Sequence, residues 1–428
     1  MTLPLVDDAP GTPSLVARTT AIPDPGDLAA LVPADVPARD VVSWLRDGDG
    51  LIGWGRAASV RTTGEDRFED AEAWWRQVSA QAVCRTDVDV PGSGPIAFGS
   101  FAFSPHSDAG AALVIPAVVV GRRDGVSWVT HISPAGRLSP APRIVPTPAA
   151  SAPGELAYSD GALTGPQWTT AIARTVELIQ AGDVDKVVMA RDVQVEAAAP
   201  IGPQWLVQRL SEQYANTWTF SVDGLIGATP EMLVRREKGL VMSRILAGTI
   251  QRTGNDERDL ALAGSLARSS KDLEEHEYAV RSVADALRPH CTSMNVPESP
   301  FVLHLPNVMH LATDVAGVLD DRASSLKLAA ALHPSAAVCG TPTAAAAAVI
   351  EELEHMDRGR YAGPVGWMDT AGDGEWGIAL RCGALDPHDT RHITIFAGCG
   401  VVAGSEPDAE LAESEAKLLP MRDALTSD

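Results

Sequence analysis

Residues typical of β-strands follow one another along much of this chain without an intervening helix, and this grouping constrains the fold more than any other feature. Predicted strands cover 96–103, 113–120, 126–132, 185–191, 218–222, 225–227, 302–310, 377–381 and 392–396. Amphipathic helices are predicted from Thr164 to Gly182, over 273–287 and over 408–425. Antiparallel strands can be joined by tight turns, whereas parallel strands need a long crossover, usually a helix. The grouping therefore predicts an α+β fold with large antiparallel β-sheets.

A proline-rich segment interrupts this pattern between Pro134 and Pro153, where six prolines lie among Ala, Ser and Thr. Such a segment cannot hold a helix or a central strand. We expect residues 1–155 to form an α+β region that contributes to the sheet scaffold, and residues 156–428 to form the catalytic region. The segment is either a boundary between domains or a long surface connection within one fold.

The charge of the chain limits its partners. With 56 acidic and 34 basic residues the formal net charge is −22, which argues against a nucleic acid or an anionic membrane. The start of the chain lacks a secretory signal, and the most apolar stretch contains Pro116 and is too short to span a bilayer. We therefore expect a cytoplasmic protein. The five scattered cysteines, without CxxC spacing, argue against a disulfide framework or a thiolate zinc site.

Acidic side chains at helical spacing offer a candidate metal site. Glu410, Glu413 and Lys417 project from one face of the last predicted helix, and Asp272 and Glu275 lie one turn apart in another. Such patterns usually mark a solvated helix face with an internal ion pair. If the two helices meet, however, their carboxylates suit Mg²⁺, which prefers oxygen ligands.

Four further residues have side chains suited to catalysis or to binding an anion. Lys186 precedes a run of apolar residues, where a buried amine would act as a base, although a lysine at a strand end often only extends to solvent. Glu231 follows Thr-Pro in a turn, where an exposed carboxylate is the ordinary alternative. Arg381 and Tyr361 also have possible structural roles, but arginine is a natural bidentate partner for a substrate carboxylate.

Two glycine-containing segments, 247–249 and 397–400, would let backbone amides approach an anion closely. Neither matches a nucleotide-binding pattern, so nucleotide binding is only weakly supported. His310, taken alone, is more typical of a core histidine than of a ligand.

Together these segments resemble one known family, the chorismate-utilising enzymes, and they occur in that family's order over most of residues 160–420. The segments are DKVVMAR (185–191), ATPEML (228–233), SRILAGT (243–249), KDLEEHE (271–277), VMHL (308–311), LHPSAAVCGTP (332–342), RYAGPVGW (360–367), DGEWGIALR (373–381), AGCG (397–400) and SEPDAELAESEAK (405–417). The first 150 residues carry little that can be matched.

The resemblance implies a two-layer fold of large antiparallel sheets flanked by helices, with a Mg²⁺-dependent chorismate site between the layers. It implies that Glu275 and Glu413 bind the magnesium ion, supported by Asp272 and Glu410. The metal would then neutralise the ring carboxylate of the substrate.

The resemblance also implies a set of substrate contacts. Arg381 and Tyr361 would hold the enolpyruvyl carboxylate, and Lys417 would lie near the bound acid groups. The remaining contacts would come from the backbone amides and side chains of Gly248, Thr249, His310, Ala337, Val338, Gly398 and Gly400.

A few positions favour one branch of the family. Lys at position 186 resembles the members that use water as the nucleophile, whereas the ammonia-using members resemble one another in having Gln there. Ala247 argues against the aminodeoxychorismate branch. Ala337 and Val338 resemble isochorismate synthases, because salicylate synthases usually have Thr in place of Ala337.

We therefore expect a monomeric isochorismate synthase that interconverts chorismate and isochorismate. Lys186 would act as the general base on water, and Glu231 as the general acid on the departing hydroxyl. The alternatives are a salicylate synthase, an ammonia-using anthranilate or aminodeoxychorismate synthase subunit, and a binding protein that has lost the reaction.

Overall fold

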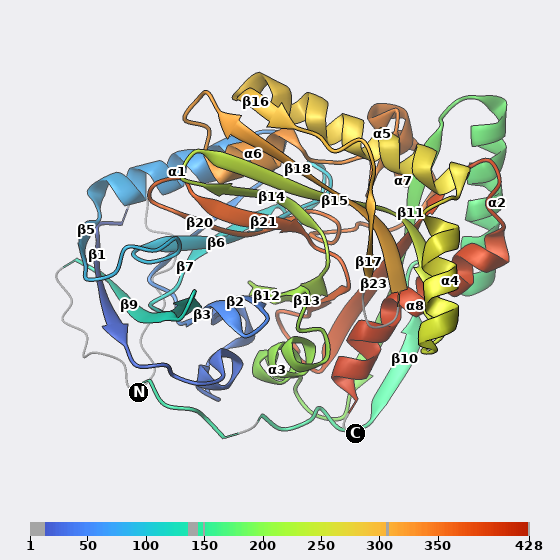
Figure 1. Ribbon diagram of the computed structural model, residues 1–428. Helices are drawn as coiled ribbons and strands as arrows, with labels where there is room; N and C mark the ends of the chain where they lie inside the picture. The colour runs from blue at the N-terminus through green and yellow to red at the C-terminus, as the bar shows by residue number, and fades with distance from the viewer. Residues whose placement is uncertain (1–12, 136–143, 149, 305–307, 427–428) are drawn as a thin grey trace.

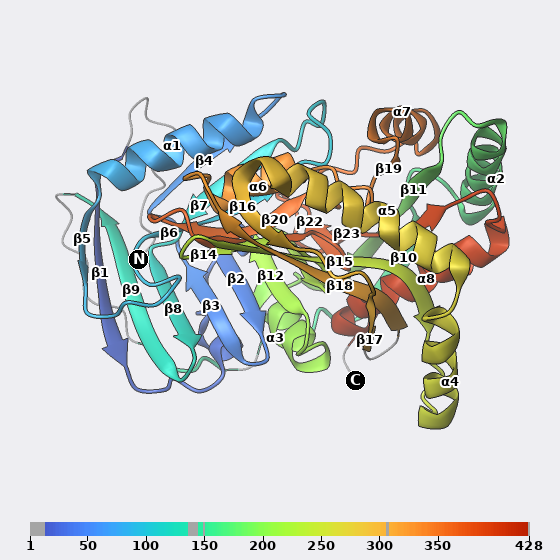
Figure 2. The same cartoon turned by 45° about the horizontal axis from the view of Figure 1, so that its top comes forward.

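The computed structural model describes residues 13–135, 144–148, 150–304 and 308–426. The side chains of Ala247, Lys271, Asp272 and Glu275 lie outside the described part, although the backbone of their elements lies within it. Figures 1 and 2 show two large β-sheets stacked in layers, with helices on their outer faces.

The larger layer is a 13-stranded sheet. Its strands, in spatial order, are β10 (Leu156–Asp160), β11 (Lys186–Ala197), β23 (His392–Val401), β22 (Cys382–Leu385), β13 (Leu225–Thr229), β12 (Trp218–Val222), β2 (Val41–Arg46), β3 (Asp49–Trp54), β8 (Val118–Arg123), β9 (Val126–Pro134), β1 (Leu15–Ile22) and β5 (Val83–Thr86), with β19 (Gly340–Thr341) paired to β11. Within the described residues, β1 and β5 are the only parallel pair of strands.

The second layer is a 10-stranded sheet in which all described strand pairs are antiparallel. Its order is β16 (Cys291–Asn295), β18 (Val308–Leu319), β15 (Leu240–Gln251), β14 (Met232–Glu237), β21 (Gly374–Ile378), β20 (Pro364–Asp369), β6 (Ile96–Phe101), β7 (Ala111–Ile115) and β4 (Ala58–Thr62), with β17 (Phe301–His304) paired to β18.

Helices cover the sheets from outside. They are α1 (Arg67–Gln81), α2 (Gly165–Ala181), α3 (Pro203–Gln213), α4 (Asp256–Leu266), α5 (Ser270–Leu287), α6 (Ser325–Ala331), α7 (Thr343–Leu353) and α8 (Pro407–Leu425). Helices α1, α5 and α6 pack on the 10-stranded sheet, whereas α2, α3, α7 and α8 pack on the 13-stranded sheet (Figure 2). The predicted α+β fold with two layers of largely antiparallel sheet is confirmed. No described helix combines the length and the apolar character needed to cross a bilayer.

The burial pattern of β2 shows how both faces of a sheet are used. Val42 and Trp44 point into the core between the layers, while Val41 and Leu45 point into a second core beneath α3. Alternate residues of a strand face opposite sides, so a strand with both sets buried must lie between two apolar layers.

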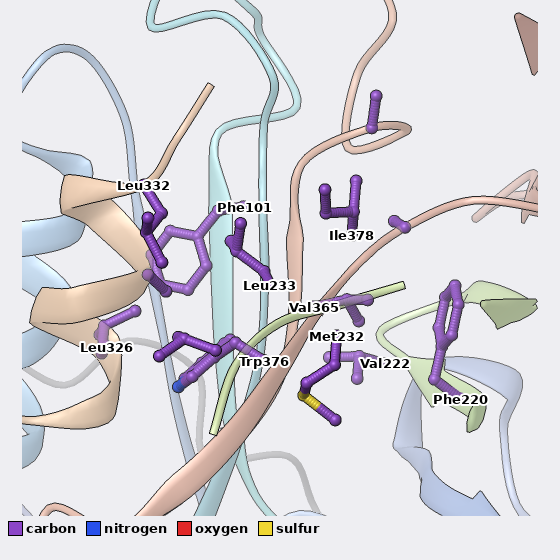
Figure 3. Close-up of a cluster of buried hydrophobic side chains, with 14 of the residues drawn as sticks. Phe101, Phe220, Val222, Met232, Leu233, Leu326, Leu332, Val365, Trp376 and Ile378 are labelled. Carbon is purple, nitrogen blue, oxygen red and sulfur yellow. The ribbon is translucent and has the colours of Figure 1, made fainter. Parts of the chain in front are cut away.

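The core on the other side of the 10-stranded sheet is built around Trp376 (Figure 3). Its ring meets Phe101 edge-on with centroids 5.7 Å apart, and its Nε1 donates a hydrogen bond to Ser325 Oγ at 3.1 Å. Leu326 and Leu332 extend the cluster. An aromatic ring thus fixes α6 on the sheet.

Both sheets combine strands from before and after the proline-rich segment. Strand β2 pairs with β12 in one sheet, and β6 pairs with β20 in the other.

The capping box at Thr164 is confirmed, since its backbone N–H donates to Gln167 Oε1 at 3.0 Å, and α2 ends at Gly182 with φ 83°.

Several predicted strands differ from the observed ones. Strands β11 and β23 continue to Ala197 and Val401, past their predicted ends at 191 and 396. The strand predicted over 113–120 is two strands, β7 and β8, in different sheets, because Pro116 interrupts the pairing where the chain crosses between them. The strand predicted over 302–310 comprises β17 and the start of β18, with 305–307 outside the described residues. The strand predicted to end at Arg381 ends at Ile378.

Candidate functional site

A cavity of about 210 Å³ opens where the two layers and α8 meet. Its lining brings together most residues singled out in the sequence: Lys186, Glu231, Gly248, Thr249, His310, Ala337, Val338, Tyr361, Arg381, Gly398, Gly400, Glu410, Glu413 and Lys417. These residues come from β11, β15, β18, β23, α8 and the connections between strands. Asp272 and Glu275 were also predicted site residues, but their side chains lie outside the described part.

Lys186 is the first residue of β11 and is 9% exposed. Its position is fixed on both sides, because β11 pairs with β19 at Lys186 and Val187 and with β23 from Val187 onward. The lysine therefore sits at the buried end of an inner strand, next to the edge strand β10, and lines the cavity.

Glu231 lies where the chain passes from β13 in one sheet to β14 in the other. Its backbone N–H donates to Thr229 Oγ1 at 3.2 Å, and its carbonyl accepts from the Ile378 N–H at 3.1 Å. Only 6% of the residue is exposed. Burial raises the pKa of the carboxyl to about 8, although the charge of Lys186 and the Leu246 amide oppose this shift. Glu231 is therefore protonated at neutral pH, as a general acid must be.

Two further cationic groups, Arg381 and Lys417, line the same cavity. Arg381 occupies the connection from β21 to β22 with φ 49°, and burial lowers the pKa of its guanidinium while Tyr361 and Glu413 partly restore it. Lys417 Nζ donates to the Gly398 carbonyl at 2.8 Å and contacts Glu413 Oε1 at 2.5 Å. These two cations suit a substrate that carries carboxylates.

Tyr361 forms part of the same wall. Its ring stacks on Phe396 with centroids 5.1 Å apart, and burial strongly raises the pKa of its hydroxyl, so the hydroxyl stays protonated as a donor. A Cβ at Gly398 would come within 3.1 Å of the Tyr361 hydroxyl, so glycine lets the strand and the ring approach each other.

Gly248 has φ 77° and lies in a bulge where β15 slips against β18. Next to it, Thr249 Oγ1 is 3.0 Å from His310 Nδ1. Burial, together with the charges of Arg381 and Lys417, lowers the pKa of His310 to about 3, so the ring is neutral. Its buried Nε2 has no hydrogen-bond partner among the described residues, which leaves a polar atom for a ligand.

Glu410 and Glu413 are the described candidates for a metal. Burial raises the pKa of the Glu410 carboxyl, a hydrogen bond with Ser405 opposes the shift, and the adjacent Glu413 adds to it. Carboxylate oxygens are the ligand atoms that Mg²⁺ prefers, so the side chains of Glu410 and Glu413 have the right chemical groups for the predicted ion. In the described part of the chain, no three His, Cys, Asp or Glu side chains converge to hold a metal by themselves. Helix α5, which carries Asp272 and Glu275, packs on β15 and β18 beside this site.

Other residues of the site were missed by sequence reasoning, notably Arg358, which lines the cavity, and its buried partner Glu354. Their spacing of four residues is typical of a helical ion pair. The exposed pair Glu277 and Arg281 has the same spacing, so the pattern alone does not reveal burial.

Comparison with known proteins gives a consistent assignment. The family model described as "Chorismate binding enzyme" matches residues 10–426. The chain is 32% identical to the salicylate biosynthesis isochorismate synthase of Pseudomonas aeruginosa over 97% of this chain and 91% of that protein. It is 39% identical to the isochorismate synthase DhbC of Bacillus subtilis over 58% of this chain, a match that spans 64% of that protein.

A solved structure supports the fold. The menaquinone-specific isochorismate synthase MenF of Escherichia coli superimposes with a TM-score of 0.79 at 22% identity, covering 98% of this chain and 97% of that one. The full-length family match and the relative aligned over nearly the whole chain lead to one conclusion: the chain belongs to the chorismate binding enzyme family.

Proposed function

We propose that this protein is an isochorismate synthase, which adds water to chorismate and releases the allylic hydroxyl. The observation that carries the proposal is that Lys186 and Glu231, from separate segments, line one cavity, with Glu231 protonated at neutral pH. The relatives from Pseudomonas aeruginosa and Bacillus subtilis, which bear this enzyme name, support the choice within the family.

The reaction needs a general base and a general acid. Lys186, in its neutral amine form, would take a proton from water as the water oxygen bonds to the ring carbon beside the carboxylate-bearing carbon. The ring double bonds shift, and Glu231 would protonate the hydroxyl that leaves as water. A positioned acid or base typically contributes about 10²–10⁴-fold to the rate.

Substrate carboxylates would be held by local cations, because a chain of net charge −22 does not attract a dianion by its overall field. Arg381 and the Tyr361 hydroxyl would bind the enolpyruvyl carboxylate, and Lys417 would lie near the ring carboxylate. The Gly248, Thr249, Gly398 and Gly400 segments would add backbone contacts, and His310 Nε2 a neutral polar contact.

Magnesium would be held by Glu413 and Glu275, with Glu410 and Asp272 in support. Once bound, Mg²⁺ would supply positive charge opposite the ring carboxylate of the substrate.

A salicylate synthase is the second candidate, since it shares the first step and then eliminates pyruvate. Ala337, which lines the cavity and stands where salicylate synthases usually have Thr, favours the first candidate. An ammonia-using synthase is disfavoured by Lys186.

The proposal includes a monomeric, cytoplasmic enzyme. Light scattering of the purified protein tests whether it is a monomer.

The test is to incubate purified protein with chorismate and Mg²⁺, with and without ammonium, and to separate the products by chromatography. We expect isochorismate in both samples. Salicylate with pyruvate would favour the second candidate, and an aminated product would favour the ammonia-using branch.

A further inference from the structure

Arg358 and Glu354 form a deeply buried ion pair at the end of α7. Their side chains are 3% and 1% exposed. Arg358 Nε donates to Glu354 Oε2 at 2.8 Å, and an Nη of the same guanidinium donates to Oε1 at 2.5 Å, so the contact is bidentate. Burial alone would lower the pKa of the guanidinium, but Glu354 raises it above its ordinary value. The guanidinium is therefore charged.

Two further hydrogen bonds of this pair go to the backbone of β11. Arg358 donates to the Val188 carbonyl at 2.6 Å, and Glu354 accepts from the Ala190 N–H at 2.7 Å. On the side of β11 that faces away from β23, the strand has two short partners. It pairs with β19 only at Lys186 and Val187 and with β10 only from Val193 onward. The two side chains thus satisfy backbone groups of β11 between two short strands, where no described strand lies alongside.

The same guanidinium also fixes a second wall of the cavity. Arg358 donates to the Val338 carbonyl at 2.9 Å, and Val338 follows Ala337 in the segment before β19. Val188 and Val338 both line the cavity. Val188 lies two residues after Lys186, and residues two apart in a strand face the same side. One ion pair therefore ties together the strand that carries Lys186 and the segment that faces it.

Stability alone does not explain this arrangement. Replacing a buried ion pair by apolar residues of similar size is often neutral or stabilising, because desolvation of two charges offsets their attraction. What apolar residues cannot reproduce is the set of directed hydrogen bonds to Val188, Ala190 and Val338.

We infer that Arg358 and Glu354 are positioning residues, which hold the Lys186 end of β11 and the 337–338 segment at the separation that the reaction needs. This inference rests on the proposed function. Neither residue needs to touch the reacting atoms. Misplacement of a reacting group by about 1 Å can cost about 10²-fold in rate, so loss of the directed contacts should lower kcat.

The test compares wild-type protein with R358M/E354L, with R358K, and with R244M/D314L as a matched control. Arg244 and Asp314 form another bidentate pair, with contacts of 2.7 and 2.8 Å, between β15 and β18 outside the cavity lining. For each variant, kcat and KM for chorismate, the folded fraction and the thermal unfolding midpoint are measured.

We expect R358M/E354L to unfold at a lower temperature than wild type, because three buried backbone groups lose their partners. At temperatures where it is folded, kcat per folded molecule should fall about tenfold or more. KM should change less than kcat. R358K should give an intermediate kcat, because lysine keeps the charge but loses the planar fork. The control should keep wild-type kcat and KM.

A wild-type kcat in folded R358M/E354L would overturn the inference. If that variant does not fold, R358K decides, and a wild-type kcat in folded R358K would equally overturn it. Absence of isochorismate formation by the wild-type protein would refute the proposed function itself and this inference with it. Equal turnover by wild type and by folded R358M/E354L would refute the positioning role but leave the proposed function standing.

Discussion

Glu231 and Arg381 lie at two adjacent points where the chain passes from one sheet to the other. Glu231 connects β13 to β14, and Arg381 connects β21 to β22. The two crossings are hydrogen-bonded side by side, since the Ile378 N–H donates to the Glu231 carbonyl at 3.1 Å and the Ala228 N–H donates to the Arg381 carbonyl at 3.2 Å. The layered fold thus sets an acid and a cation at one end of the space between its sheets.

Removing the proposed base or acid should abolish turnover without abolishing binding. We expect K186A and E231Q each to lower kcat by about 10²–10⁴-fold, because each removes one proton-transfer partner. Steady-state kinetics gives kcat, and calorimetric titration with chorismate gives the dissociation constant. Wild-type kcat in either variant would contradict the assigned role.

The activity should decline at alkaline pH. Glu231 acts only while protonated, and its pKa is raised to about 8 by burial, so kcat/KM should fall as pH rises through about 8. A pH profile of initial rates at constant ionic strength measures this. A kcat/KM that stays constant well above pH 8 would show that Glu231 is not the acid.

The same group should make stability depend on pH. Between its ordinary pKa of 4.5 and about 8, Glu231 binds a proton in the folded state but not in the unfolded state. Its contribution therefore lowers the free energy of unfolding as pH rises through this window. Urea unfolding of E231Q, which cannot ionise, should show a smaller decrease over the same window than wild type.

Arg381 should be needed for binding a carboxylate. Hydrogen bonds to charged groups contribute about 1.5–3 kcal/mol, so R381A should weaken chorismate binding by about 10- to 150-fold. R381K should recover only part of the affinity, because lysine lacks the bidentate fork. Titration calorimetry measures both, and unchanged affinity in R381A would place the carboxylate elsewhere.

Metal dependence should reside in the cavity-facing acids of α8. E413A should lose the increase in rate that Mg²⁺ gives to chelator-treated wild type. Glu415 on the same helix pairs with Arg191 and does not line the cavity, so E415Q is the matched control and should keep its Mg²⁺ response. An unchanged Mg²⁺ titration in E413A would remove Glu413 from the proposed ligands.

Local signals in the sequence predicted only part of the elements. Helices α1, α3, α4 and α6, and strands such as β1, β2, β3, β14, β15 and β20, were not predicted. The capping box at Thr164 and the helical spacing up to Gly182 depend on neighbouring residues only, and α2 follows them. The run over 113–120 misled the prediction, because the assignment of β7 and β8 to different sheets depends on distant pairing partners.

The site was predicted through its recognisable segments, and the cavity gathers them. The sequence did not reveal the ion pair that holds two walls of the cavity. Arg358 and Glu354 have an ordinary helical spacing, and only the folded chain buries them against β11. Arg381 was expected within a strand, yet it lies past the strand end at φ 49°.

The central claim is that water supplies the new hydroxyl group in a cavity formed by Lys186 and Glu231. The most direct measurement is to run the reaction with chorismate and Mg²⁺ in H₂¹⁸O and to analyse the earliest isochorismate by mass spectrometry. We expect one ¹⁸O atom per product molecule, located in the new hydroxyl. Isochorismate without label, or no isochorismate at all, would contradict it.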